Sequence, residues 1–327
     1  MADCMEKDWS FTGSDGVHTL YATIWEPSEG EPRAVIQICH GMMEHIRRYD
    51  RFARALCDRG FVVCGDDHLG HGRTAEQPED LGYFGETDGW KHMAEDELLL
   101  RREMQRRYPD KPYFLLGHSM GSFITRRVIA LDGEGLAGYI CCGTAGRNPL
   151  TKLGIGLAGI VTALRGPKRT GRFLNAMAFQ NYNRRFPEDD NELAWLSRDK
   201  DGYPDASEDP KCHFVFTNAG FRDLFRLLDS VTGPKWSDRV PKDLPIVLFS
   251  GEMDPVGSYG KGPRQVYGWL KASGVRDLSL KLYPDARHEL HNELNRDEFL
   301  EDVVAWCDRH MEGGRQPLPR KGLVLFL

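Results

Sequence analysis

The feature that most constrains this chain is the stretch at residues 113–121, which reads Y-F-L-L-G-H-S-M-G. An apolar run typical of a β-strand ends at Gly117, Ser119 follows two residues later, and Gly121 comes next. Apolar residues then recur at helical spacing, so the pattern predicts a strand that turns sharply into a helix. Such a tight turn leaves no room for large side chains beside it, which accounts for the glycines. The turn would present the Ser119 hydroxyl at a helix N-terminus, where negative charge is stabilised.

Short apolar runs alternate with helical patterns on both sides of this turn. Strands are predicted at residues 17–25, 34–39, 60–65, 113–117, 138–143, 244–251 and 278–283. Helices are predicted at residues 49–59, 90–108, 266–273 and 297–310. This alternation indicates an α/β protein whose mostly parallel central sheet carries helices on both faces. The arginines and glutamates of the 90–108 helix are expected to form a solvated face.

The alternation breaks between residues 144 and 241, where the pattern is helical and irregular. A segment inserted between two strands of one sheet is expected to lie over the strand ends, where α/β sheets bind ligands. We therefore predict an α/β core from 1–143 and 242–312, with a helical cap at 144–241 inserted before the penultimate strand. The tail at 313–327 fits no element and is a candidate for disorder.

Composition narrows the class of protein. The hydrophobic content of 40% and charged content of 28% are those of a globular chain. A net charge of −6 over 327 residues gives no basic excess, so no nucleic-acid partner is expected. No apolar run reaches the roughly 18 residues of a membrane span. The eight scattered cysteines and the polar start, without a visible signal peptide, predict a cytoplasmic protein.

A serine nucleophile needs a base, and the base needs an orienting carboxylate. Asp254 follows the 244–251 strand by three residues, on the edge of the sheet where Ser119 is expected. Glu252 lies closer to that strand, and Asp243 precedes it on the opposite edge, so both compete less well. The ordinary alternative for Asp254 is a turn aspartate that caps its own backbone.

His288 is the preferred base because it follows the last predicted strand. His291, one helical turn further on, is the rival, and a capping or core histidine is the ordinary alternative. The resulting order of Ser119, Asp254 and His288 along the chain is the order found in α/β-hydrolases.

Attack of a serine on an acyl carbonyl also needs two backbone N–H groups that stabilise the oxyanion. Met120 follows the predicted nucleophile directly and would supply one amide. The loop after the 34–39 strand would supply the other at Met42.

Two groups of residues contain metal-ligand residue types but lack the spacing of a known metal-binding motif. Residues 288–291 read H-E-L-H, one residue short of the H-E-x-x-H pattern. A second group, consisting of Asp66, Asp67, His68 and His71, is better explained by structural hydrogen bonding in a glycine-bracketed turn. We therefore expect no catalytic metal and no other cofactor.

Five motifs occur in the order of a known family. They read H-G-M-M-E-H-I-R-R-Y, G-D-D-H-L-G-H-G-R-T, L-L-G-H-S-M-G-S, G-E-M-D-P-V-G and Y-P-D-A-R-H-E. Over about residues 17–311 the chain resembles the monoacylglycerol lipase/lysophospholipase group of α/β-hydrolases, the serine-aminopeptidase-like family. The resemblance implies the α/β-hydrolase fold.

The resemblance also implies roles for individual residues. The family's nucleophile, acid and base fall on Ser119, Asp254 and His288, and its oxyanion amides fall on Met42 and Met120. One departure is Ser122, at a position where the family usually has a second glycine. Serine is small enough to keep the turn.

The cap contains two apolar stretches that are candidates for an acyl pocket. The pocket prediction names Leu153, Ile155, Leu157, Ile160, Phe214 and Phe221. A helix that is apolar on all sides is also typical of a buried helix, and its glycines would allow close packing. The same segment is a candidate for transient contact with a membrane surface.

The expected function is cleavage of small-molecule carboxylic esters of acyl lipids, of monoacylglycerol or lysophospholipid type, through an acyl-enzyme. An aminopeptidase or amidase is the first alternative, with Glu188, Asp189 or Asp190 binding a substrate amine. The second is a non-catalytic ligand-binding protein of the same fold, which is disfavoured because all three catalytic positions are filled.

Overall fold

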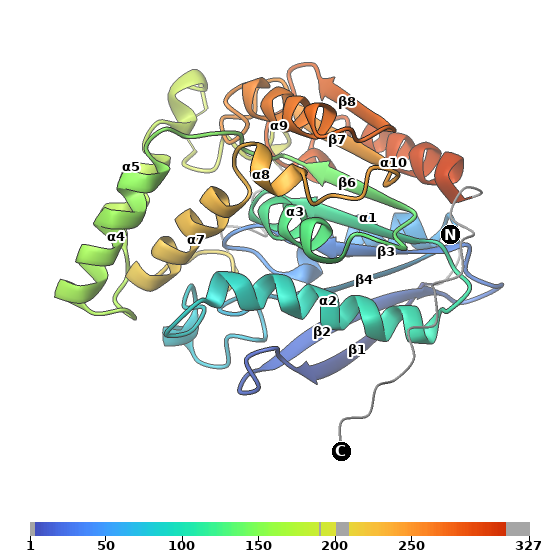
Figure 1. Ribbon diagram of the computed structural model, residues 1–327, viewed down its shortest axis with the longest axis horizontal. Helices are drawn as coiled ribbons and strands as arrows, with labels where there is room; N and C mark the ends of the chain where they lie inside the picture. The colour runs from blue at the N-terminus through green and yellow to red at the C-terminus, as the bar shows by residue number, and fades with distance from the viewer. Residues whose placement is uncertain (1–3, 190, 201–208, 312–327) are drawn as a thin grey trace.

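An eight-stranded sheet forms the centre of the computed structural model, which describes residues 4–189, 191–200 and 209–311 (Figure 1). Its strands are β1 (Cys4–Thr12), β2 (Thr19–Pro27), β3 (Ala34–Cys39), β4 (Phe61–Asp67), β5 (Tyr113–His118), β6 (Gly138–Cys142), β7 (Ile246–Gly251) and β8 (Leu278–Tyr283). They lie in the order β1-β2-β4-β3-β5-β6-β7-β8. β2 runs antiparallel to β1 and β4, and the other neighbours are parallel. The predicted tail at 313–327 lies outside the described residues.

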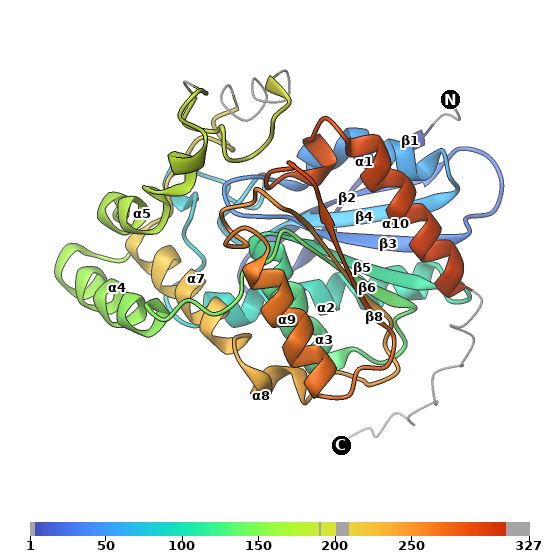
Figure 2. The ribbon, with the colours of Figure 1, turned by 90° about the horizontal axis from the view of Figure 1, so that it is seen from above.

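Helices cover both faces of the sheet, as predicted (Figure 2). One face carries α2 (Gly89–Arg107), α3 (Met120–Asp132) and α9 (Lys261–Ala272), and the other carries α1 (Asp50–Cys57) and α10 (Arg296–Met311). Short 3₁₀ turns lie at η1 (Ile46–Tyr49), η2 (Pro78–Asp80) and η5 (Leu290–Asn292). β3 to β7 are buried along their whole length, because side chains on both faces pack under helices.

β1 is absent from the sequence prediction. It forms an exposed edge strand that pairs with β2 and carries charged side chains such as Glu6, Lys7 and Asp8. Charged residues protect a sheet edge from pairing with other chains. Because of these charged residues, β1 lacks the continuous apolar run that predicts the buried strands.

The chain leaves the sheet after β6 and returns at β7, so the insertion precedes the penultimate strand as predicted. The inserted elements are α4 (Thr151–Arg165), α5 (Arg172–Phe179), η3 (Tyr182–Arg185), α7 (Asn218–Ser230) and α8 (Pro234–Ser237). α4, α5 and α7 gather beyond one end of the sheet (Figures 1 and 2). Among the helices of the described residues, none combines the length and apolarity needed to cross a bilayer.

Candidate active site

Ser119 lies in the sharp turn between β5 and α3. Its backbone adopts φ 55° and ψ −121°, a region that non-glycine residues rarely occupy and that stores strain. The Ser119 N–H donates to the Cys142 carbonyl of the neighbouring strand at 3.0 Å, which holds the turn in place. A Cβ on Gly121 would lie 2.0 Å from the Cys39 carbonyl oxygen, so only glycine permits this close approach.

Ser122, the predicted departure from the family pattern, contributes to this turn. Its hydroxyl lies 2.6 Å from the Ser119 carbonyl oxygen and 2.7 Å from Thr144 Oγ1. The Ser122 N–H donates to the same Ser119 carbonyl at 2.9 Å. Serine at this position therefore keeps the turn and adds a polar link to the strand end after β6.

The structure brings the predicted acid and base together beyond the ends of β7 and β8. His288 Nδ1 lies 3.0 Å from Asp254 Oδ1. That oxygen also accepts the Val256 N–H at 2.8 Å, which fixes the carboxylate in its loop. Both side chains are buried, at 0% and 2% exposure. Within the described residues His288 Nε2 has no hydrogen-bond partner, so it is available to a hydroxyl.

Ser119 and His288 line one cavity of about 600 Å³. A serine hydroxyl, an imidazole and a carboxylate in this arrangement can generate a nucleophile at neutral pH. Met42 and Met120, the predicted oxyanion residues, line the same cavity together with Gly41. β3 and β5 are parallel neighbours with Cys39 opposite Gly117, which places the loop after β3 beside the turn at Ser119.

The alternative candidates for the base and the acid lie in other environments. His291 stacks on Tyr49 with ring centroids 4.4 Å apart, and burial lowers the pKa of His291 to about 3. Asp243 forms an exposed ion pair with Arg276, and Glu252 is exposed.

A buried charge network supports the loop after β3, which carries the predicted oxyanion residue Met42, and no site prediction included this network. Glu44 accepts the Gly41 N–H and, at 2.9 Å, the Tyr49 hydroxyl. Arg48 pairs with Glu44 at 2.8 Å and with both carboxylate oxygens of Glu289 at 2.9 and 3.0 Å. The Gly41 amide of this loop is therefore held by a carboxylate that is itself paired with Arg48. The residues of this network belong to the H-G-M-M-E-H-I-R-R-Y and Y-P-D-A-R-H-E motifs, so these motifs were the sequence signal that could have identified the network.

His118 links this network to the base. Its Nε2 donates to the His288 carbonyl at 3.2 Å, and its Nδ1 lies 3.0 Å from the Tyr49 hydroxyl and 3.4 Å from Glu44. Burial by itself would lower the pKa of His118, but the hydrogen bond and charge of Glu44 raise it above its usual value. Burial would likewise raise the pKa of Glu44, but His118 and Arg48 hold it well below its usual value.

The cavity wall differs from the predicted pocket. Of the six predicted residues, Leu153 lines the cavity. Ile155, Leu157, Ile160, Phe214 and Phe221 do not, so this part of the prediction is corrected. Further apolar lining comes from residues outside the prediction, among them Phe123, Met177, Phe179, Leu224, Phe225 and Leu228.

Position along the helices explains the correction. Leu153 and Gly154 line the cavity from the first turn of α4, whereas Ile160 lies two turns further along the same face of the helix and is 59% exposed. Phe221 is fully buried in the core, one turn before the α7 residues that do reach the cavity, and Phe214 lies beside a ring of the core, with centroids 5.8 Å from His71.

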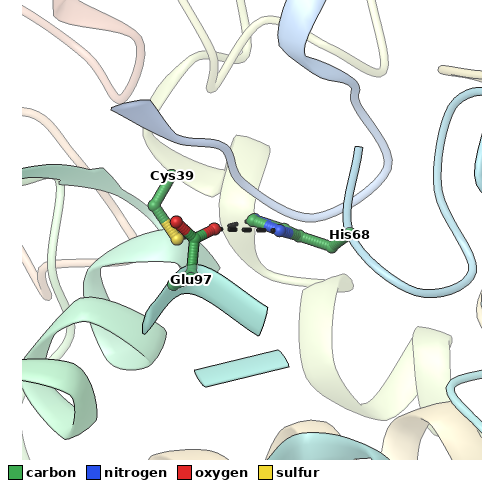
Figure 3. A group of neighbouring side chains, drawn as sticks. All are labelled: Cys39, His68 and Glu97. Carbon is green, nitrogen blue, oxygen red and sulfur yellow. Dashed lines mark hydrogen bonds and ion pairs between the residues drawn. The ribbon is translucent and has the colours of Figure 1, made fainter. Parts of the chain in front are cut away.

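Two groups of side chains in the described residues have metal-ligand character. His45, Asp209 and Cys212 form one, in which His45 Nε2 already pairs with Asp209 at 2.8 Å. Cys39, His68 and Glu97 form the other and lie in the core, where the His68 ring faces the other two side chains (Figure 3). Burial raises the pKa of Glu97 well above its usual value, so a protonated Glu97 hydrogen-bonded to Asp66 and Cys39 accounts for this second group without an ion.

Comparisons with known proteins agree with this geometry. The family described as "Serine aminopeptidase, S33" matches residues 30–295. Monoglyceride lipase of Mus musculus is 30% identical over 303 residues, covering 91% of this chain and 89% of that protein. Monoacylglycerol lipase of Mycolicibacterium smegmatis is 27% identical and covers 95% of this chain and 100% of that protein.

Two solved structures are similar in sequence and fold. A highly thermostable carboxyl esterase from Bacillus coagulans, in complex with glycerol, is 34% identical with a TM-score of 0.87, covering 95% of this chain and 99% of that chain. A lipase in its open form is 30% identical with a TM-score of 0.85, covering 95% and 100%. The chain therefore belongs to the serine aminopeptidase, S33, family and is a carboxylic ester hydrolase of the α/β-hydrolase fold.

Proposed function

We propose that the chain cleaves acyl-lipid esters, of monoacylglycerol or lysophospholipid type, with Ser119 as nucleophile, His288 as base and Asp254 as its orienting acid. The observation that carries the proposal is the shared cavity, which is lined both by Ser119 and His288 and by apolar residues of the cap. The relatives named monoglyceride lipase and monoacylglycerol lipase support the same substrate class.

The reaction would proceed in two steps. Ser119 Oγ attacks the ester carbonyl while His288 Nε2 takes its proton, and the amides of Met42 and Met120 stabilise the oxyanion. His288 then protonates the leaving alcohol. In the second step His288 accepts a proton from water, which attacks the acyl-enzyme, and His288 then returns this proton to Ser119 Oγ as the acyl–oxygen bond breaks and the fatty acid leaves. Asp254 keeps the imidazole oriented and stabilises its charge.

The cavity suits an acyl chain in size and polarity. Its volume of about 600 Å³ lies within the usual range for small-molecule sites. Each buried methylene contributes about 0.8 kcal/mol, so a chain of twelve carbons would gain several kcal/mol of binding.

Aminopeptidase activity has less support, because a substrate amine needs a free carboxylate. Among the described residues that line the cavity, the carboxylates are Glu44 and Glu289, and both pair with Arg48.

The cap carboxylates considered for that role give no further support. Asp189 pairs with Lys200 at 2.8 Å and with Arg287 at 2.7 Å. Glu188 is exposed and does not line the cavity, and Asp190 lies outside the described residues.

We propose that residues 144–241 act as a cap that touches a lipid surface through α4 and α5. Large apolar side chains are exposed there, namely Leu150, Leu153, Ile160, Leu164, Phe173 and Met177. Leu153 and Met177 are exposed and also line the cavity, so this apolar surface borders its mouth. An exposed apolar patch beside a lipid pocket is what contact with a substrate surface requires.

We also propose a cytoplasmic location. All eight cysteines are free, and most are buried, which suits a reducing compartment.

Hydrolysis of nitrophenyl esters of graded chain length, monoacylglycerol, lysophospholipid and an aminoacyl anilide tests the substrate proposal. We expect preference for medium and long acyl chains, cleavage of at least one of the two lipids, and no anilide cleavage. Preference for the shortest ester together with anilide cleavage would favour the peptidase alternative. Ser119→Ala serves as the background control for each substrate.

A further inference from the structure

The first half of the cap carries charge of one sign. Residues 135–187 contain eight lysines and arginines and no aspartate or glutamate, although acidic residues outnumber basic ones in the whole chain by 49 to 43. All eight cations are exposed, and they are Arg147, Lys152, Arg165, Lys168, Arg169, Arg172, Arg184 and Arg185. The net charge of −6 is therefore distributed unevenly, with a basic region on the cap.

Most of these cations lack a carboxylate partner. Lys168 pairs with Asp80 at 3.1 Å, and the Arg185 guanidinium lies over the Tyr259 ring, 3.6 Å from its centroid. Within the part of the chain that the structure describes, the other six form no ion pair with a carboxylate. Their positive charge is therefore left for a partner outside the chain to neutralise.

The exposed face of α4 is apolar, in contrast to an ordinary surface helix. Leu153, Ile160 and Leu164 are between 59% and 80% exposed on this face. The opposite face packs on α7, where Gly154 contacts Phe225. A helix at the surface of a globular protein normally directs polar residues outward. An outward face made of leucine and isoleucine therefore indicates an apolar environment in the working state.

α5 extends this face, and the cations surround it. Phe173 and Met177, one helical turn apart on α5, are 55% and 40% exposed. Figures 1 and 2 show α4 and α5 as neighbours at the outer end of the cap. Lys152 and Arg165 lie at the two ends of α4, and the other cations lie before α4, between the helices, at the start of α5 or after it. We call this surface of α4, α5 and their flanking loops the basic apolar face.

Charge distinguishes between the partners that could cover an apolar face. A second copy of the chain, joined through the same face, would bring two sets of unpaired cations together, which is unfavourable. An anionic bilayer surface instead offers hydrocarbon to the apolar side chains and negative headgroups to the cations. Lysine and arginine side chains beside a buried apolar face extend to headgroup depth.

We propose that the basic apolar face docks on a lipid surface rich in anionic headgroups. This inference rests on the proposed lipid contact of the cap and adds the chemistry of the partner, which is anionic and not zwitterionic lipid. Leu150, Leu153 and Met177 belong to the face and also line the cavity. Docking would therefore place the mouth of the cavity against the surface, so that an acyl chain enters without crossing water.

Sedimentation of the full chain with vesicles tests this surface. The vesicles consist of ether-linked phosphatidylcholine, which contains no ester, with or without about one third of ether-linked phosphatidylglycerol. We expect at least about tenfold stronger binding to the anionic vesicles, and loss of that preference at 1 M salt, where the screening length falls to about 3 Å.

Neutralising cations of the face tests its role directly. Each cation near an anionic surface strengthens binding about fivefold, so the triple variant Arg165→Gln, Lys168→Gln, Arg169→Gln should bind about a hundredfold more weakly. None of these three residues lines the cavity, so hydrolysis of a short soluble nitrophenyl ester should not change. The control variant Arg59→Gln, Arg102→Gln, Arg106→Gln removes the same charge from exposed positions of the core and should bind like the wild type.

Equal binding to both kinds of vesicle would overturn the proposal, as would equal binding of the two triple variants. A dimer in sedimentation velocity that dissociates in Leu164→Asp would also overturn it and assign the face to a second copy. Hydrolysis of monoacylglycerol in neutral detergent micelles keeps this question separate from the proposed function. Cleavage there without preference for anionic vesicles would refute the docking alone, whereas anionic docking without cleavage of any lipid ester would support the docking and refute the substrate proposal.

Discussion

Arg48 lies at the centre of the buried charges below the loop that carries Met42, and Arg48→Met should destabilise the protein strongly. The side chains of Arg48, Glu44 and Glu289 are 8%, 3% and 6% exposed. Methionine keeps an unbranched apolar side chain but removes the guanidinium that pairs with two buried carboxylates. Removing one partner of a buried ion pair costs about 3–5 kcal/mol. A loss of this size lowers the melting temperature by about 4–7 °C in a chain of this length.

The dependence on pH identifies the cause. Burial would raise the pKa of Glu289, but Arg48 holds it at about 2. In the wild type this carboxylate therefore contributes stability above its unfolded pKa of about 4.3, and the contribution is lost as pH falls toward 2. Without Arg48, burial raises the folded pKa above the unfolded one, so the variant is least stable at high pH. Its deficit relative to wild type should shrink between pH 7.5 and pH 5.

Thermal melts at both pH values measure this effect. Arg47→Met is the matched control, because Arg47 is 44% exposed and its surface ion pairs contribute less than about 1 kcal/mol. The triple variant Arg48→Met, Glu44→Gln, Glu289→Gln should recover much of the lost stability. If Arg48→Met melts within about 2 °C of Arg47→Met at pH 7.5, the reasoning about buried charge is wrong.

Three further predictions concern the cavity, a buried histidine and the turn. Leu228→Trp should lower the ratio of kcat/KM for long over short acyl esters by about tenfold, while Ile160→Trp should not, and equal ratios would contradict the observed lining. Folded His291 has a pKa of about 3 and unfolded histidine about 6.5, so stability falls as pH drops below 6.5. Between pH 7.5 and pH 5 the free energy of unfolding should therefore fall by about 2 kcal/mol less in His291→Phe than in the wild type. An equal fall in both proteins would refute this. Ser122→Ala removes a 2.6 Å contact with the Ser119 carbonyl and should cost about 1 kcal/mol in urea unfolding; no change would mean that the contact is not stabilising.

The buried strands could be predicted because each is a continuous apolar run between turn residues. The edge strand β1 could not, since its exposed charged side chains give no such run. The solvated face expected for the 90–108 helix was wrong for Glu97, which is fully buried. Its partners Gln37 and His68 lie far away in the sequence, and local periodicity carries no information about them.

The three proposed catalytic residues could be named from the sequence because each follows a recognisable strand end. The cavity wall could not, since α4 is apolar on every side and its glycines indicate no direction. In the structure Gly154 packs against Phe225 of α7, and both residues line the cavity. Arg47 and Arg48 likewise look alike in the sequence. Burial against Glu289, from the opposite end of the chain, distinguishes them.

Labelling with a fluorophosphonate, followed by mass spectrometry of the peptides, tests the central claim most directly. Such a probe reacts with a serine only where a neighbouring base activates it. We predict one label per chain on the peptide that contains Ser119, a large drop in labelling rate in His288→Ala, and no label in a folded Ser119→Ala variant. A label on another residue, or undiminished labelling of Ser119→Ala, would contradict the account.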